Sequence, residues 1–186
     1  MAENSTNGFK ELPRDIASVV SHGQTYIFFV NGHHQLCYLK SPQEDTDDFE
    51  YHVVKVTNGN LRVKCGSRQV AAMAYDNQGD HEIRIYCVAP EDGQCSKRGY
   101  IQEVAYNMVN GWELGTLGED DPKTWIDNDA CLSASALEWP DKADLKLFVS
   151  GKDKKTDRPK VTSYFYDHAE SRWLEQGVVS NKVSKW

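Results

Sequence analysis

Arg84 and Glu103 are the residues whose types and spacing give the chain its clearest chemical signal. Arg84 lies in the run IRIY and Glu103 lies in the run IQEVAY. A guanidinium is a planar fork of hydrogen-bond donors and a carboxylate offers paired acceptors, so the two together can bind adjacent hydroxyl groups. The simpler alternative is a cross-strand ion pair, which contributes little to stability at a surface.

Both residues belong to a stretch, residues 70–118, that predicts four consecutive antiparallel strands. Its apolar-rich runs are bounded by Gly, Asn, Asp or Pro and lie at residues 70–75, 83–88, 101–106 and 112–117. Such runs with turn residues between them are typical of strands. Because consecutive strands of a meander are neighbours, Arg84 and Glu103 are expected to meet on one face of this sheet.

The same layout recurs on both sides of this stretch. The later copy has runs at 133–139, 145–149, 161–167 and 173–178, and a fainter copy has runs at 16–20, 25–30, 35–39 and 51–56. Ile83 and Leu145, which are equivalent in two copies, lie about 62 positions apart. The repeat predicts an all-β chain of three four-stranded propeller blades, at about 15–66, 67–128 and 129–186, after a flexible N-terminal arm over 1–14.

Composition limits the partners that we expect. The chain has 186 residues, a net charge of −7 and 11% aromatic residues. A chain of this length can bury a core, and plentiful aromatic rings suit small sheets packed face to face. The acidic charge argues against nucleic acid and anionic membranes as partners. The polar N-terminal residues predict neither a signal peptide nor a membrane span.

The cysteines predict a reducing compartment and hence a cytoplasmic protein. There are five of them, an odd number without metal-ligand spacing, namely Cys37, Cys65, Cys87, Cys95 and Cys131. Free thiols are the simplest interpretation. A bridge between Cys87 and Cys95 across the long turn between two strands is the alternative.

No cofactor or metal ion is expected. The chain lacks a nucleophile elbow, a phosphate-binding Gly loop, a zinc-protease motif and a dinucleotide fingerprint. The His33-His34 pair beside the acidic loop 41–48 is interpreted as a solvated loop, since adjacent histidines on a strand point to opposite faces. The carboxylates of residues 119–129 lack the alternating pattern of a calcium-binding loop and are interpreted as a loop between blades.

The run IRIYCV…IQEVAY…GWELGTLG resembles one blade of the fungal fucose-specific lectins of the Aleuria type. Members of that family are six-bladed propellers that bind a sugar between adjacent blades. The resemblance implies that Arg84 and Glu103 bind the hydroxyl groups and ring oxygen of the sugar. It also implies that Trp173, from the next blade, stacks on the apolar face of the sugar.

Two of the three blades depart from this pattern. The Arg and Glu positions fall on Tyr26 and Tyr38 in the first blade, and on Lys146 and Ser163 in the third. Tyr26 and Tyr38, with Trp112 of the next blade, are expected to form an aromatic pocket for a flat or apolar ligand.

Three blades do not close a ring, so we expect a homodimer of six blades. Lys146 would then belong to a site shared between chains, with Phe49 or Tyr51 of the other chain.

Two functions follow from the resemblance. The first is a fucose-binding lectin that recognises fucosylated glycans through Arg84, Glu103 and Trp173. The second, which the lost sugar pairs favour, resembles fungal lectin-like pericyclases that join a tropolone quinone methide to a humulene-type sesquiterpene by hetero-Diels–Alder coupling, without a cofactor. There Arg84 would polarise the tropolone oxygens and Glu103 would act as a general acid–base.

Overall fold

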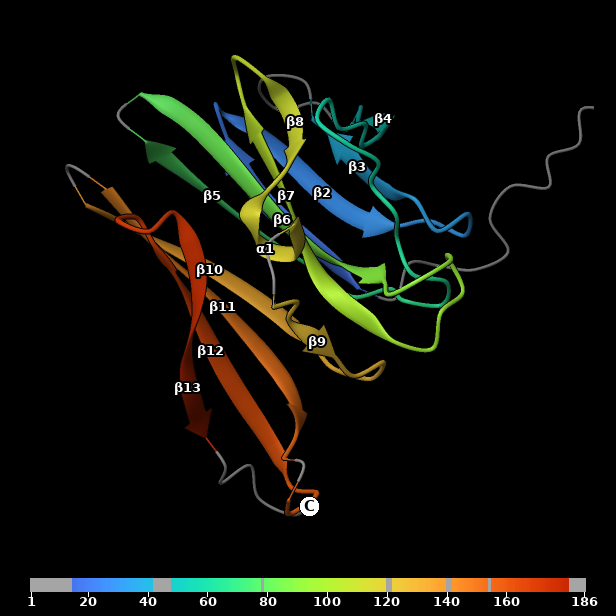
Figure 1. Ribbon diagram of the computed structural model, residues 1–186. Coiled ribbons are helices and arrows are strands. Elements are labelled where there is room, and N and C mark those ends of the chain that lie inside the picture. The colour runs from blue at the N-terminus through green and yellow to red at the C-terminus, as the bar shows by residue number, and fades with distance from the viewer. Residues whose placement is uncertain are drawn as a thin grey trace, which may run out of the picture.

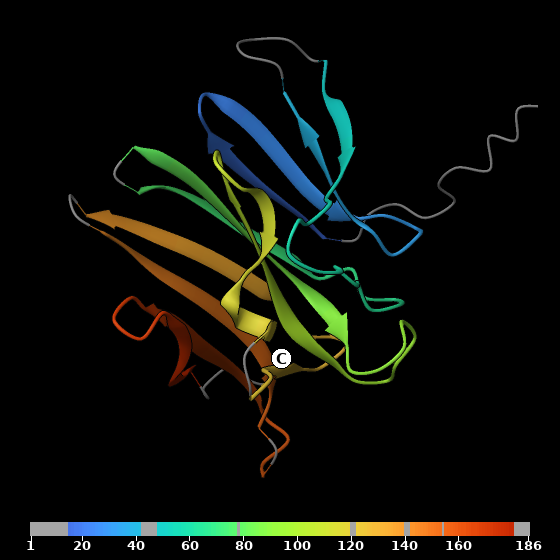
Figure 2. The ribbon, with the colours of Figure 1, turned by 45° about the horizontal axis from the view of Figure 1, so that its top comes forward.

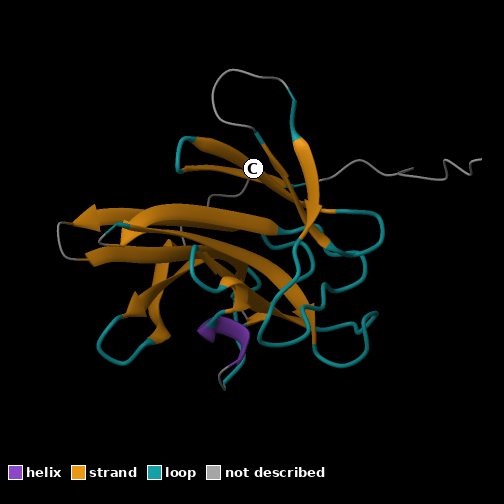
Figure 3. Ribbon diagram, turned by 90° about the horizontal axis from the view of Figure 1, so that it is seen from above, coloured by secondary structure: helices purple, strands orange, loops and turns teal. Residues whose placement is uncertain are grey.

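The computed structural model describes residues 15–41, 48–77, 79–119, 122–139, 142–153 and 155–180. The predicted N-terminal arm therefore lies outside the described residues. Three antiparallel sheets follow one another along the chain and fan out in that order (Figure 1). Nearly all the rest is loop, apart from one short helical turn (Figure 3).

Each sheet is a meander in which consecutive strands pair. The first sheet contains β1 (Ile16–Ser21), β2 (Gln24–Val30), β3 (Leu36–Lys40) and β4 (Glu50–Val53). The second contains β5 (Val70–Asn77), β6 (Asp80–Pro90), β7 (Gly99–Asn107) and β8 (Gly111–Leu114). The third contains β10 (Leu132–Trp139), β11 (Lys142–Lys152), β12 (Pro159–Asp167) and β13 (Arg172–Ser180). All twelve predicted strands are present, although the strand expected over 51–56 ends at Val53.

The chain between the second and third sheets differs from the prediction. The strand expected over 112–117 ends at Leu114, and the chain turns into α1 (Thr116–Glu119), where Gly118 has a φ of 104°. Part of the expected loop forms a short strand, β9 (Trp125–Ile126), which pairs with the start of β7. The second sheet therefore has five strands, because the loop returns alongside β7.

Alternate residues of the second sheet serve two different cores, as the period of a strand dictates. Ile83, Ile85 and Cys87 pack against the first sheet, and we call this contact between the first and second sheets the first interface. Tyr86 and Ile101 pack against the third sheet, and we call this contact between the second and third sheets the second interface. Figure 2 shows the second sheet lying between the other two.

The expectation of five free thiols is wrong. Cys65, in the β4–β5 connection, forms a disulfide with Cys95 in the β6–β7 loop, with the two Cα atoms 4.8 Å apart. The alternative bridge between Cys87 and Cys95 is also wrong, because Cys87 is a buried free cysteine in the first interface. The inference of a reducing, cytoplasmic setting thus loses its premise.

No helix among the described residues is long and apolar enough to cross a membrane.

Candidate functional site

Strand register places the predicted site residues at equivalent positions in the three sheets. Tyr86 pairs with Glu103, Phe28 pairs with Tyr38, and Phe148 pairs with Ser163. Arg84, Tyr26 and Lys146 each lie two residues before the first member of the pair in their sheet. The alignment of the three copies made from sequence therefore holds at the level of individual strand pairs.

Arg84 and Glu103 meet at the second interface, as expected for neighbouring strands. Arg84 Nη1 lies 3.6 Å from Glu103 Oε1. A second carboxylate, that of Glu82, pairs more closely with Arg84 through Nη2. Arg84 also donates a hydrogen bond from Nε to the Tyr75 hydroxyl, over 3.2 Å. The guanidinium is thus held by three partners, two of them negatively charged.

Glu103 is enclosed by protein, with an exposed fraction of 0%. The Tyr86 hydroxyl donates a hydrogen bond to its Oε1 (3.3 Å), and the Leu117 amide (3.3 Å) and the Trp173 indole Nε1 (3.2 Å) donate to Oε2. A Cβ added at Gly115 would clash with Oε2, so the backbone closes directly over the carboxylate. A ligand could reach Glu103 only by displacing one of these donors.

Glu82 and Arg84 are the charged groups of this cluster that keep some access to solvent. Their side chains are 12% and 19% exposed. Glu82 also accepts hydrogen bonds from the Tyr75 hydroxyl (2.6 Å) and from the Asn77 side-chain amide (2.8 Å). The cluster formed by Arg84, Glu82, Glu103 and Tyr75 therefore holds one cation between two carboxylates, with Glu82 at its edge.

The charges of this cluster are mutually stabilising. Burial disfavours ionisation of Glu82, but Arg84 together with the hydrogen bonds from Tyr75 and Asn77 outweighs it, and the pKa of Glu82 is lowered. Burial also disfavours the charged guanidinium, yet the neighbouring carboxylates raise the pKa of Arg84 above its ordinary value. Both groups remain ionised at neutral pH.

Trp173 reaches the cluster from the third sheet. Its ring lies edge-on to Tyr86, with ring centroids 5.6 Å apart, and contacts Tyr166 at 5.8 Å. The structure thus brings Arg84, Glu103 and Trp173 together across the second interface.

The aromatic residues predicted to form a pocket lie together at the first interface. Tyr38 and Trp112 have ring centroids 5.6 Å apart, and Tyr26 and Tyr38 are 5.9 Å apart. Tyr26 is 7% exposed and Trp112 is 8% exposed, because the rings pack against one another and against Phe28. They form part of a core here and line none of the cavities described below.

The third pair of positions lies on the side of the third sheet that no other described sheet covers, although Ser163 itself is buried. Lys146 is exposed on β11, and Ser163 donates a hydrogen bond from its hydroxyl to the Gln176 side chain over 2.9 Å. This pair therefore stands apart from the other predicted site residues.

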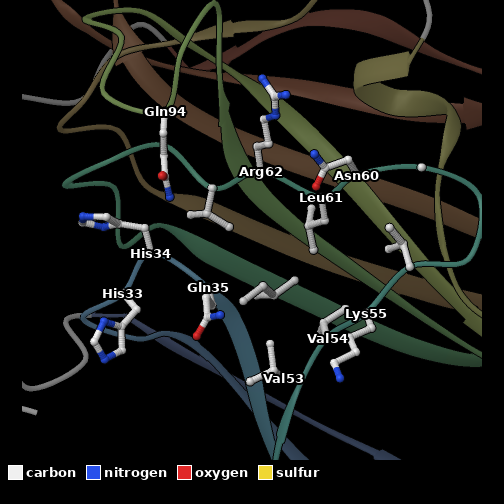
Figure 4. Close-up of a pocket in the computed structure, with 14 residues that line it drawn as sticks. His33, His34, Gln35, Val53, Val54, Lys55, Asn60, Leu61, Arg62 and Gln94 are labelled. Carbon is white, nitrogen blue, oxygen red and sulfur yellow. The ribbon is translucent and has the colours of Figure 1, made fainter. Parts of the chain in front are cut away.

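The larger cavities lie away from the predicted residues. One of about 660 Å³ lies between β3, β4 and the β4–β5 connection, and Figure 4 shows His33, His34, Arg62 and Gln94 around it. Another of about 650 Å³ lies beside Trp125 and the β11–β12 turn. Within the described part of the chain, no group of three or more His, Cys, Asp or Glu residues is arranged to hold a metal ion. The acidic loop 42–47 lies outside the described residues.

Sequence reasoning missed Glu82 and Tyr75. The signal was present, since Glu82, Arg84 and Tyr86 alternate along one strand and so share a face. Tyr75 is the cross-strand partner of Glu82 in the β5–β6 pair.

Neither the protein-family models nor the curated proteins compared with this chain give a match. Among solved structures, the chain is similar to the Aleuria aurantia lectin (AAL) N224Q mutant in complex with alpha-methyl-L-fucoside. The TM-score is 0.63 and the identity is 16%, over 89% of this chain and 49% of the lectin chain. The chain has the fold of about half of that lectin. At this identity, the likeness extends to the fold alone.

Proposed function

We propose that the chain is a carbohydrate-binding protein that binds a fucose-type sugar at the second interface. The single observation that supports this most is that Arg84, which pairs with Glu82, and the Trp173 indole both contact Glu103, in a fold shared with a lectin that holds a fucoside. Charged donors and acceptors beside an indole are what a sugar requires, because its ring has hydroxyl groups around its edge and an apolar C–H face.

In this proposal Arg84 and Glu82 bind sugar hydroxyl groups, since they are the members of the cluster with access to solvent. Glu103, which the resemblance assigns to the sugar, serves mainly to hold Arg84 and the Trp173 indole in place. The roles of the two carboxylates are thus divided differently from the pattern that the sequence implied.

The lectin hypothesis is favoured over the hetero-Diels–Alder hypothesis. The solved structure that this chain resembles in fold is a lectin in complex with a fucoside. None of the comparisons gives comparable support to a coupling enzyme. The ring contacts between Tyr26, Tyr38 and Trp112 also fill the space that an apolar substrate would need at the first interface.

Calorimetric titration of the purified chain with L-fucose tests the proposal. We expect heat of binding that is lost in Arg84→Ala and in Trp173→Ala. Arg158→Ala, which changes an exposed arginine in the β11–β12 turn, and Trp125→Ala, which removes an indole from another surface, are matched controls that should bind as the wild type does. Absence of heat with the wild type would contradict sugar binding. Unchanged binding by Arg84→Ala would mean that the sugar binds elsewhere.

We also propose that a second copy of the chain completes a ring of six sheets. Two facts support this: the described residues form three sheets, and the chain aligns with 49% of the matched lectin chain.

A further inference from the structure

The two interfaces inside the chain are built in the same way. In each, a sheet presents apolar residues from alternate positions of its strands to the sheet before it. Ile83 and Ile85 of the second sheet and Leu145 and Leu147 of the third sheet serve this role, and all four are at most 2% exposed. The sheets therefore pack in a repeating order, each covered by the one before it.

The first sheet has the same kind of face with nothing described against it. Ala17 and Val19 pack toward the second sheet, so Ile16 and Val20 point to the opposite side. We call this side the free face of the first sheet. Strand register adds further apolar residues to it, and the members that carry the argument are Ile16, Val20, Ile27, Phe29, Leu39 and Tyr51.

This free face is strongly apolar and open to solvent. Ile16 is 66% exposed, Val20 is 67% exposed and Tyr51 is 46% exposed. Contiguous exposed apolar residues of this kind mark interaction surfaces in soluble proteins. Val20 occupies the same register position as Ala74 and Ala136, which both pack inside the chain.

The third sheet has the complementary side uncovered. Ala134 and Ala136 pack toward the second sheet, which leaves Leu137 and Trp139 on the opposite side, 58% and 51% exposed. Register places Lys146 and Phe148 on that same side, which we call the free face of the third sheet. Leu137 is equivalent to Tyr75, a residue that is buried against the third sheet at the second interface.

We infer that the free face of the third sheet binds the free face of the first sheet of a second copy of this chain. The inference specifies the surfaces of the proposed ring closure and does not depend on sugar binding. A pair related by a two-fold axis makes this contact twice, so that both copies bury both faces. A second copy is the partner that fits, because the chain already forms this type of contact twice within itself.

The internal interfaces also predict the pairing within the new one. At the second interface, β5 lies against β10, and the Asp76 amide donates a hydrogen bond to Glu138 over 2.9 Å. Tyr75 of the second sheet and Ala136 of the third sheet belong to the same core at the second interface. Leu137 is equivalent to Tyr75 and Val20 is equivalent to Ala136, so Leu137 of one copy is expected beside Val20 of the other.

The new interface should differ chemically from the second one. The register of β3 and β4, extended by one pair beyond Lys40 and Glu50, places Phe49 at the position of Trp112 and Trp173. Phe49, which is 39% exposed, would then approach Lys146 and Ser163 of the other copy. An aromatic ring would be present there, but the Arg–Glu pair would not.

The mass of the full chain in solution, measured by light scattering after size exclusion, tests the inference. We expect the wild type to have twice the chain mass of 21.1 kDa. Val20→Glu and Leu137→Lys should each give a monomer, because each buries an unpaired charge at both contacts of the pair. Val109→Glu, at a residue that is 85% exposed in the β7–β8 turn, is the matched control and should leave the dimer intact.

Mixing the two single variants gives the sharpest result. A pair of one Val20→Glu chain and one Leu137→Lys chain has one contact with opposite charges and one wild-type contact, so we expect the mixture to recover the dimer mass. A monomeric wild type would overturn the inference. A Leu137→Lys variant that stays dimeric would overturn it too, since the dimer would then use other faces. Loss of fucose binding alone would leave these results unaffected.

Discussion

The indole Nε1 of Trp173 donates a hydrogen bond to Glu103 Oε2 over 3.2 Å, although the two residues are 70 positions apart in the chain. Glu103 belongs to the second sheet and Trp173 to the third, so this bond crosses the second interface. Because Glu103 has no access to solvent, the carboxylate depends on protein donors. The candidate sugar site and the contact between two sheets are therefore built from the same residues.

Removal of this donor should weaken the second interface. Trp173→Phe keeps an aromatic ring beside Tyr86 but leaves the buried Glu103 one donor short. We expect the free energy of unfolding to fall by about 1–3 kcal/mol, measured by urea denaturation followed by circular dichroism. The control is Trp125→Phe, because Trp125 is 43% exposed, and it should lower the free energy of unfolding much less. Equal losses in the two variants would contradict the role given to the Glu103 contact.

Of the two interfaces between the described sheets, the second alone brings an arginine and carboxylates together with an indole. If sugar binds there as proposed, we expect one fucose bound per chain. Tyr38 at the first interface packs against Tyr26 and Trp112 and offers no charged group. Calorimetric titration should give a stoichiometry of one, and Tyr38→Phe should bind fucose as the wild type does. A stoichiometry of two fucose molecules per chain would show that another interface, which lacks the Arg–Glu pair, also binds sugar.

The ionised form of Glu82 should stabilise the protein at neutral pH but not in acid. The pKa of Glu82 is lowered from its ordinary value of 4.5, so the folded state binds the proton less readily than the unfolded state. This stabilisation is present above about pH 4.5, and it is lost as the pH falls through the lower pKa that Glu82 has in the folded state. Urea midpoints measured across this range should fall in acid, and Glu82→Gln should reduce that dependence. If the urea midpoint of Glu82→Gln depends on pH as steeply as that of the wild type, Glu82 is not the source of the pH dependence.

The cysteines should react in three distinct steps. Cys131 is exposed, while Cys37 and Cys87 are buried, and burial raises the pKa of the Cys87 thiol to about 12. A thiol reagent should therefore modify Cys131 in the native protein and three cysteines after denaturation. After reduction it should modify all five. Five reactive thiols in unreduced, denatured protein would contradict the Cys65–Cys95 disulfide.

Loss of that disulfide should lower the stability of the fold. The bridge joins residues 30 positions apart and links the β4–β5 connection to the β6–β7 loop. Replacement of both cysteines by serine should lower the free energy of unfolding by about 2–4 kcal/mol, measured by urea denaturation. The Cys131→Ser variant is the control, since its thiol is exposed and unpaired. An unchanged midpoint in the double variant would mean that the bridge is not needed for stability.

Local pattern was sufficient to predict the strands and their pairing. The alternation of apolar residues and the turns between them placed all twelve meander strands, and the repeat aligned Glu103 with Tyr38 and Ser163 in the correct register. This succeeded because a meander pairs neighbours in the sequence, so its register follows from short-range turns and from which side is buried.

Contacts between sheets were decided only by the tertiary structure. The sequence by itself determined that Arg84 and Glu103 share a face, but not that Glu82 pairs more closely with Arg84 or that Trp173 and the backbone near Gly115 enclose Glu103. Nor did it determine that Cys95 pairs with Cys65, because the two cysteines lie in different loops. Such contacts depend on how separate elements pack in three dimensions, and that packing leaves no fixed spacing along the chain.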